Sequence, residues 1–306
     1  MNKIFISTTS FGEYDSSPIE LCEKNGYAVL RNPYGRTISP DELIKLANDA
    51  VGIIAGTEIM TKDVLSQLPL LKVISRCGVG LDNIDLVAAD DAGIKVFNTP
   101  DVPTQAVAEL TIGLMLASLR RISEADRSIR TGKWNKPMGN LLAGKIIGII
   151  GYGRIGKAVS KLAGAFEAKV ITFDIKPPSK VSMVKTVSFD ELITTSDIIT
   201  LHLSSKYSKE CIINSDVIAK MKNRAYIINT SRGGLIDENA LYDALKSGKL
   251  AGAGIDTFTE EPYTGKLAEL DNVVLTPHIG SYAKEARIAM EKQAVDNLLK
   301  GLEVKI

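Results

Sequence analysis

Histidine and cysteine are both scarce in this chain of 306 residues, which holds two histidines and three cysteines. Cys22, Cys77 and Cys211 are odd in number and widely spaced, and they form no C-x-x-C pair. This spacing argues against a disulfide framework and a thiolate metal site, and it favours a reducing compartment. We therefore expect no bound metal. Any mechanism that needs an imidazole has two candidates, His202 and His278.

A surplus of charge and a long hydrophobic run are also missing. The 37 basic and 36 acidic residues leave a formal net charge of +1, so attraction by bulk charge to nucleic acid or to a membrane surface is not expected. The longest apolar stretch, residues 108–119, contains Glu109 and is shorter than the ~20 residues of a membrane span. The N-terminus lacks the apolar core and cleavage site of a signal peptide. We expect a cytoplasmic protein with neither a nucleic-acid nor a membrane partner.

Short β-branched runs alternate with amphipathic segments on both sides of a turn-rich stretch at residues 98–103. This alternation predicts βα units around parallel sheets, and the length fits two domains at roughly 150 residues each. A helical pattern over 104–130 predicts one long helix. Another over 284–301 predicts a helix that returns to the first domain. We therefore expect two doubly wound parallel-sheet α/β domains, one of residues 1–100 plus 283–306 and one of residues 101–282.

A G-x-G-x-x-G pattern lies between an expected strand and an expected helix, and it comprises Gly151, Gly153, Arg154, Ile155 and Gly156. Its glycines would permit a tight turn, a close approach of backbone to pyrophosphate, and close packing of helix on strand. Asp174 stands 18 residues after Gly156, at the end of the next expected strand. A carboxylate there can accept hydrogen bonds from ribose hydroxyls and would repel a 2′-phosphate. The pattern predicts a Rossmann domain that binds NAD.

Three polar segments follow expected strands of the second domain: N-T-S-R-G-G at 229–234, D-T-F-T-E-E-P at 256–262 and T-P-H-I-G at 276–280. In an open parallel sheet this is the edge at which ligands bind. Together with G-Y-G-R-I-G at 151–156, these segments resemble the D-isomer-specific 2-hydroxyacid dehydrogenases, especially the phosphoglycerate dehydrogenase branch. The resemblance covers essentially the whole chain.

The resemblance implies three catalytic residues. Arg232 would bind the substrate carboxylate and polarise its carbonyl, His278 would be the acid and base, and Glu261 would be the partner of His278. These residue types suit the reaction, because hydride delivery to C2 of a 2-keto acid builds negative charge on an oxygen that needs both a cation and a proton donor. Arginine supplies a permanent planar cation, and histidine exchanges protons near neutral pH.

The resemblance also implies residues around the ligands. Four would lie at the cofactor in addition to the glycine turn and Asp174: His202, Thr230, Asp256 and Gly280. A loop in the first domain would bind the substrate with backbone N–H groups, together with Arg232 and His278, and it comprises Arg76, Cys77, Gly78, Val79 and Gly80. The first domain would thus be a flavodoxin-like substrate domain, into which the NAD-binding domain is inserted.

The substrate stays open. 3-Phosphoglycerate leads, but phosphoglycerate enzymes commonly place an arginine near the position of Gly56-Thr57-Glu58, and this departure leaves glycerate-like, glyoxylate, lactate-like and phosphonate-bearing acids as alternatives. The chain also resembles the short form that lacks the C-terminal regulatory domain of longer phosphoglycerate dehydrogenases.

Two other classes share the expected fold. An NAD-sensing protein similar to the C-terminal-binding corepressors has the same Arg-Glu-His set. Formate dehydrogenases pair their histidine with glutamine, and position 261 is glutamate. Family members dimerise through the region that corresponds to residues 104–130, where Leu110, Leu114, Met115 and Leu119 would form an apolar face. A homodimer is therefore expected.

Overall fold

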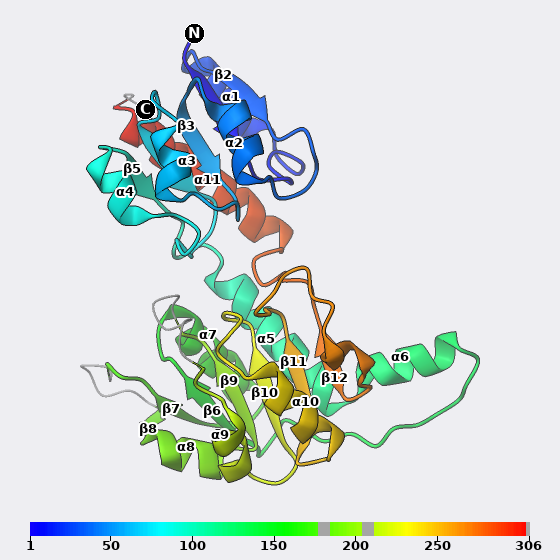
Figure 1. The fold of residues 1–306 in the computed structure, drawn as a ribbon. Coiled ribbons are helices and arrows are strands. Elements are labelled where there is room, and N and C mark those ends of the chain that lie inside the picture. The colour runs from blue at the N-terminus through cyan, green and yellow to red at the C-terminus, as the bar shows by residue number, and fades with distance from the viewer. Residues whose placement is uncertain (177–183, 204–210, 304–306) are drawn as a thin grey trace. The chain divides into compact units, whose positions relative to one another are not determined.

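The computed structural model describes residues 1–176, 184–203 and 211–303, and it divides the chain into two compact units (Figure 1). Unit 1 combines Met1–Pro103 with Ser281–Ile306, and unit 2 is Thr104–Gly280. Residues 177–183, 204–210 and 304–306, which the expected domains include, lie outside the described residues.

Unit 1 is built on a five-stranded parallel sheet in the order β2-β1-β3-β4-β5. Its strands are β1 (Lys3–Ile6), β2 (Ala28–Arg31), β3 (Ala50–Ala55), β4 (Val73–Arg76) and β5 (Lys95–Phe97). The central strand β3 is buried at every position, as helices on both faces of a parallel sheet require. The helices of this unit are α1 (Ser17–Lys24), α2 (Pro40–Ala47), α3 (Lys62–Ser66), α4 (Leu86–Asp91) and α11 (Lys284–Gly301).

The C-terminal helix α11 packs into the core of unit 1, although some 180 residues separate it from the rest of that unit (Figure 1). Met290 and Leu298 are fully buried beside Ile4 and Ile54. The fit is close, because a β-carbon added at Gly52 of β3 would lie 3.0 Å from Leu298 Cδ1. The chain therefore completes the first sheet only when its last helix returns.

Unit 2 is built on a seven-stranded parallel sheet in the order β12-β11-β10-β9-β6-β7-β8. Its strands are β6 (Ile146–Ile150), β7 (Lys169–Phe173), β8 (Lys185–Thr186), β9 (Ile198–Leu201), β10 (Ala225–Asn229), β11 (Leu250–Ile255) and β12 (Val273–Leu275). The order reverses between β6 and β9, which is the switch point where doubly wound sheets bind ligands. The expected fold class, two doubly wound parallel-sheet domains, is confirmed.

Helices cover both faces of the second sheet (Figure 1). They are α5 (Thr104–Leu119), α6 (Ile122–Arg130), α7 (Arg154–Ala165), α8 (Phe189–Thr195), α9 (Ser215–Lys220), α10 (Glu238–Lys246) and the 3₁₀ helix η2 (Lys266–Glu269). No helix in the described part of the chain combines the length and apolar character that crossing a membrane requires.

The single helix expected over 104–130 is wrong, because the chain breaks between α5 and α6. Arg121 adopts a left-handed backbone with φ of 53°, which ends the helical hydrogen-bond series. The N–H of Asn140 donates to the carbonyl of Leu119 at 2.9 Å, so a later segment caps the end of α5. Of the expected apolar face, Leu114, Met115 and Leu119 are buried in the core of unit 2, and Leu110 is partly buried against the same core.

Candidate active site

The glycine turn of unit 2 is shaped by backbone contacts that allow no side chain at two positions. Gly151 follows β6 with φ of 94°, and a β-carbon there would lie 2.4 Å from the carbonyl oxygen of His202. A β-carbon at Gly156 would lie 2.2 Å from the carbonyl oxygen of Gly151. Gly153 differs, because the space around its Cα is open and it caps α7 with no side-chain hydrogen bond. The first turn of α7, with Arg154 and Ile155, thus presents its N–H groups at an open surface that suits a pyrophosphate.

Asp174 follows β7 and lies beside this turn. Its two carboxylate oxygens accept hydrogen bonds from the backbone N–H groups of Tyr152 and Lys176, each at 2.8 Å. A carboxylate has room for about four hydrogen bonds, so acceptor capacity remains for ribose hydroxyls. The glycine turn and Asp174 together fit a dinucleotide of the NAD type.

His202 lies directly after β9 and is buried behind the glycine turn. Its Nε2 is 3.0 Å from the Thr200 hydroxyl. Burial lowers the pKa of this imidazole to about 3, so the ring is neutral throughout the physiological range. The structure therefore gives the first of the two histidines no means to act as a proton donor.

Asp256, directly after β11, organises the turn that carries the second histidine. The carboxylate is fully buried and accepts hydrogen bonds from the Thr276 hydroxyl and from the N–H groups of Ile279 and Gly280, at 2.5, 2.8 and 2.9 Å. Burial raises its pKa, against the opposing effect of these hydrogen bonds. The backbone of the 276–280 turn is thus anchored to Asp256, and the cofactor contact inferred for this residue stays a prediction.

Glu261 and His278 form the titratable pair at this edge. His278 Nδ1 lies 2.9 Å from one carboxylate oxygen of Glu261 and 3.2 Å from the other. The two side chains are 43% and 38% exposed, so a substrate can reach them. Burial favours the neutral form of Glu261. Hydrogen bonds from His278 and the Phe258 N–H, together with the charges of His278 and Arg232, outweigh the effect of burial. The pKa of Glu261 is therefore lowered. The carboxylate is thus held ionised beside the imidazole.

His278 has a strained backbone, with φ of 53° in a region that residues with a β-carbon rarely adopt. Its N–H donates to the Asp256 carbonyl at 2.9 Å, which helps to hold the backbone in this conformation. Strain of this kind persists where the surroundings fix it, and it concentrates at functional positions.

Arg232 lies in the loop after β10, within electrostatic range of Glu261. Its Nη1 donates to the Ser231 carbonyl at 2.7 Å, and its own carbonyl accepts from the Asn229 side chain at 2.8 Å. A β-carbon at Gly233 would lie 1.8 Å from the carbonyl oxygen of Phe258, so the arginine loop runs directly against the segment that leads to the glutamate. The structure thus brings together the three residues expected to be catalytic.

Thr230 and Thr111 also lie near this edge, and only Thr230 was expected from the sequence. Thr230 is buried, and its hydroxyl lies 2.8 Å from the hydroxyl of Thr111 in α5. Thr111 was missed, because a threonine inside a helical pattern gives no signal of a partner on a distant strand.

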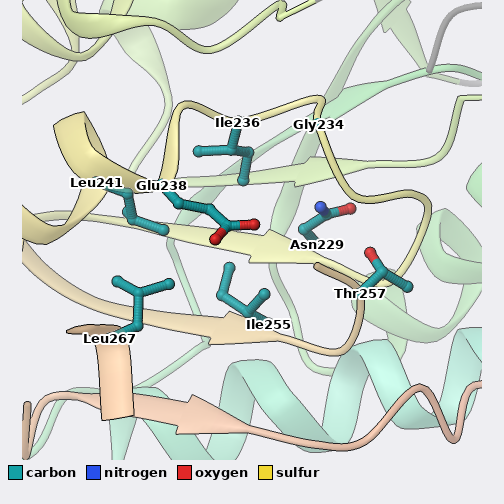
Figure 2. A pocket seen from close by; sticks show the side chains of 8 residues that line it. All are labelled: Asn229, Gly234, Ile236, Glu238, Leu241, Ile255, Thr257 and Leu267. Carbon is teal, nitrogen blue, oxygen red and sulfur yellow. The ribbon is translucent and has the colours of Figure 1, made fainter. Parts of the chain in front are cut away.

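A small cavity lies beneath the Arg232 loop, between β10, β11 and α10 (Figure 2). Figure 2 shows the side chains of Asn229, Glu238 and Thr257 facing it from among apolar neighbours. It has room for about one water molecule, so it is not a substrate site.

The expected substrate loop of unit 1 follows β4. Gly78 has φ of 151°, and a β-carbon there would lie 2.7 Å from Nη1 of Arg76, so the guanidinium covers this glycine. The N–H of Gly78 donates to the Thr99 hydroxyl at 2.9 Å. Cys77 is buried and burial raises its thiol pKa to about 11, so it is a packing residue and not a nucleophile. Val79 and Gly80 lie at the open side of the loop.

Unit 1 also holds buried charges that were not expected from the sequence. Glu58 is 2% exposed, and the ion pair of Arg287 with Glu291 on α11 is 6% and 1% exposed. The i,i+4 spacing of that pair was visible in the sequence, but such a pair is ordinarily a solvated feature of a helix surface.

Comparison with known proteins shows the family to which this α/β fold belongs. Residues 112–280 match the model of the D-isomer specific 2-hydroxyacid dehydrogenase, NAD binding domain. The chain is 43% identical to a hydroxypyruvate reductase of Thermotoga maritima, over 87% of this chain and 90% of the relative. It is equally similar, at 43%, to a D-3-phosphoglycerate dehydrogenase of Methanocaldococcus jannaschii, over 87% of this chain and 52% of that longer protein.

Solved structures agree. The TT0316 protein of Thermus thermophilus matches with a TM-score of 0.90 at 35% identity, over 98% of this chain and 97% of that one. The chain therefore belongs to the D-isomer specific 2-hydroxyacid dehydrogenase family. It is an NAD-dependent oxidoreductase of that family with a small hydroxy or keto acid as substrate, as the motifs indicated.

Proposed function

We propose that the chain interconverts a D-2-hydroxy acid and its 2-keto acid with His278 as the acid and base. The observation that carries this proposal is the contact of its Nδ1 with the Glu261 carboxylate at 2.9 Å. A carboxylate at Nδ1 fixes the proton on that nitrogen and leaves Nε2 to exchange a proton with the substrate oxygen. During reduction of the keto acid, the imidazolium gives the proton on Nε2 to the oxygen on C2. During oxidation, Nε2 takes a proton back from that oxygen. Glu261 stabilises the imidazolium.

Arg232 and the loop of residues 76–80 are proposed to bind the substrate. The guanidinium of Arg232 would bind the carboxylate and stabilise the negative charge that grows on the carbonyl oxygen. In unit 1 the glycines at positions 78 and 80 would let backbone N–H groups approach the same carboxylate.

The cofactor is proposed to lie along the glycine turn of unit 2, where NAD supplies or accepts the hydride when it is bound. Gly153 with the first turn of α7 would hold its pyrophosphate, and Asp174 would bind its ribose hydroxyls. His202 would pack beside it as a neutral ring. Thr230, Asp256 and Gly280 would shape the nicotinamide side.

Among the substrates that the names of relatives suggest are hydroxypyruvate and glyoxylate on one side and 3-phosphoglycerate on the other. An NAD-sensing function like that of the corepressors would give tight NADH binding with no turnover of any 2-keto acid. The half-exposed His278–Glu261 pair favours turnover, because proton exchange needs access.

The first test compares His278→Ala with His202→Ala, using NADH oxidation against a panel of 2-keto acids. We expect His278→Ala to lower kcat by roughly a hundredfold or more, as the loss of a general acid does. His202→Ala serves as the matched control because its ring is neutral and buried. A larger loss of kcat in the His202 variant would overturn the assignment.

A homodimer is proposed as well. Its support is a set of exposed apolar side chains on α6 and the loop after it: Ile122, Ile129, Trp134, Met138 and Leu141. In Figure 1 α6 extends away from the second sheet, and the loop after it returns to the sheet. A monomer mass by light scattering would contradict the proposal.

The three cysteines are free in the structure, which supports a cytoplasmic location.

A further inference from the structure

A buried carboxyl group lies at the ligand-binding edge of unit 1. Glu58 follows β3, and one of its oxygens is 2.5 Å from the hydroxyl of Ser7, which follows β1. The N–H of Gly56 donates to both Glu58 oxygens at 3.1 and 3.0 Å and to the Ser7 hydroxyl at 2.8 Å. These contacts fix the carboxyl group at the carboxyl ends of two adjacent strands.

The segment that carries Glu58 is tied by hydrogen bonds to Asn83, three positions after the expected substrate loop of residues 76–80. The side-chain amide of Asn83 donates to the Glu58 carbonyl at 2.6 Å, and the N–H of Met60 donates to the Asn83 carbonyl at 2.7 Å. The charge of Arg76 acts on the Glu58 carboxyl group, which places the two groups within electrostatic range. The Arg76 guanidinium of the loop therefore favours the ionised form of the Glu58 carboxyl group, which burial opposes.

Uncharged hydroxyl groups follow Ser7 in the loop after β1. Within the part of the chain that the structure describes, the hydroxyl oxygens of Thr8 and Ser10 are buried and have no hydrogen-bond partner. Thr8 is close to the carboxyl group, because a β-carbon added at Gly56 would lie 3.3 Å from Thr8 Cγ2 and 2.9 Å from a Glu58 oxygen. Hydroxyl groups of this kind suit a neutral polar substituent of a ligand.

We propose that Glu58 is a specificity-determining residue that restricts the enzyme to small 2-keto acids whose substituent at carbon 3 is uncharged, with hydroxypyruvate as the model substrate. The carboxylate offsets the charge of Arg76 and opposes the approach of a phosphate dianion, and its burial weakens the screening of this repulsion by water. Glu58 acts through this charge and not by contact. The inference rests on the proposed function, in which residues 76–80 bind the substrate.

The test compares hydroxypyruvate with 3-phosphohydroxypyruvate, which differ by the phosphate alone, in steady-state NADH oxidation by the wild type and Glu58→Gln. We expect the wild type to prefer hydroxypyruvate in kcat/KM, and Glu58→Gln to narrow that preference by on the order of tenfold, mainly through KM for the phosphorylated acid. The urea midpoint of Glu58→Gln, measured alongside, separates loss of charge from loss of packing.

Glu20→Gln is the matched control, because Glu20 also accepts from a serine, Ser16 at 2.6 Å, but on the exposed surface of the same unit. It should leave the preference unchanged. Equal use of both substrates by the wild type, or an unchanged preference in Glu58→Gln, would overturn the inference while the proposed function stands. If the wild type turns over neither these acids nor glyoxylate nor pyruvate, the proposed function itself fails and takes the inference with it.

Discussion

The titratable pair at the edge of unit 2 lies in different surroundings from the buried charges of unit 1. In unit 2 the pair of His278 and Glu261 is about two-fifths exposed, and its contacts lower the pKa of the carboxyl group. In unit 1 Glu58 and the Arg287–Glu291 pair are almost wholly buried, and burial raises the pKa of both carboxyl groups.

This difference follows from what each edge is proposed to do. A group that exchanges protons with a substrate must be reached by it, whereas a group that acts through its charge is most effective where water does not screen it. Changes in unit 2 should therefore alter the rate and leave the fold intact. Changes to the buried charges of unit 1 should alter stability or selectivity.

The largest effect on stability is expected for Glu291→Gln, which leaves the Arg287 guanidinium buried without its counter-charge. Glu291 also accepts from the N–H of Gly12 at 3.0 Å, so the substitution loosens the loop after β1 as well. Breaking a buried pair on one side costs about 3–5 kcal/mol. Urea unfolding of the variant should show this loss.

The matched control is Asp126→Asn, because Asp126 and Arg130 form the same i,i+4 pair on α6 with side chains 55% and 75% exposed. It should change the free energy of unfolding by about 0.5 kcal/mol or less. The double variant Arg287→Met/Glu291→Leu should regain most of the loss. Equal effects of Glu291→Gln and Asp126→Asn would refute the contrast between buried and exposed charge.

A smaller effect is expected on the cofactor side of unit 2. Asp174→Ser removes the carboxylate proposed to bind ribose hydroxyls and to repel a 2′-phosphate. The ratio of kcat/KM for NADH to that for NADPH should fall by about tenfold, or 1.4 kcal/mol. Asp190→Asn, an exposed acid of the same unit, should leave the ratio unchanged. An unchanged ratio in Asp174→Ser would show that the carboxylate has no part in cofactor choice.

The sequence allowed most of the fold to be predicted, because parallel strands buried on both faces are continuous apolar runs between turn residues. The helix expected over 284–301 agrees with the structure residue for residue. The break at Arg121 could not be predicted, since neither glycine nor proline marks it. A backbone contact from Asn140, distant in sequence, closes the end of α5.

The candidate site could likewise be predicted from the sequence only in part. The residues at the strand ends of unit 2 could be predicted from short motifs, because the topology of a parallel sheet brings its carboxyl ends to one edge. The buried state of Glu58 could not, because a glutamate in a loop between a strand and a helix is ordinarily solvated. Its position depends on Ser7 and Gly56, which meet only when β1 and β3 pair.

The smallest expected effect is the direction in which stability changes with pH at the two edges. The variants Glu58→Gln and Glu261→Gln measure it. The folded pKa of Glu58 is above its ordinary value of 4.5, so the folded state binds the extra proton and this group's contribution to stability is lost as the pH rises through the folded pKa. The folded pKa of Glu261 is below 4.5, so its contribution is present above 4.5 and is lost as the pH falls through the folded pKa. The urea midpoint of the wild type minus that of Glu58→Gln should therefore fall as the pH rises above 4.5. The urea midpoint of the wild type minus that of Glu261→Gln should instead grow as the pH rises toward 4.5 and then stay level. Slopes of the same sign for the two variants would show that burial does not separate the two edges.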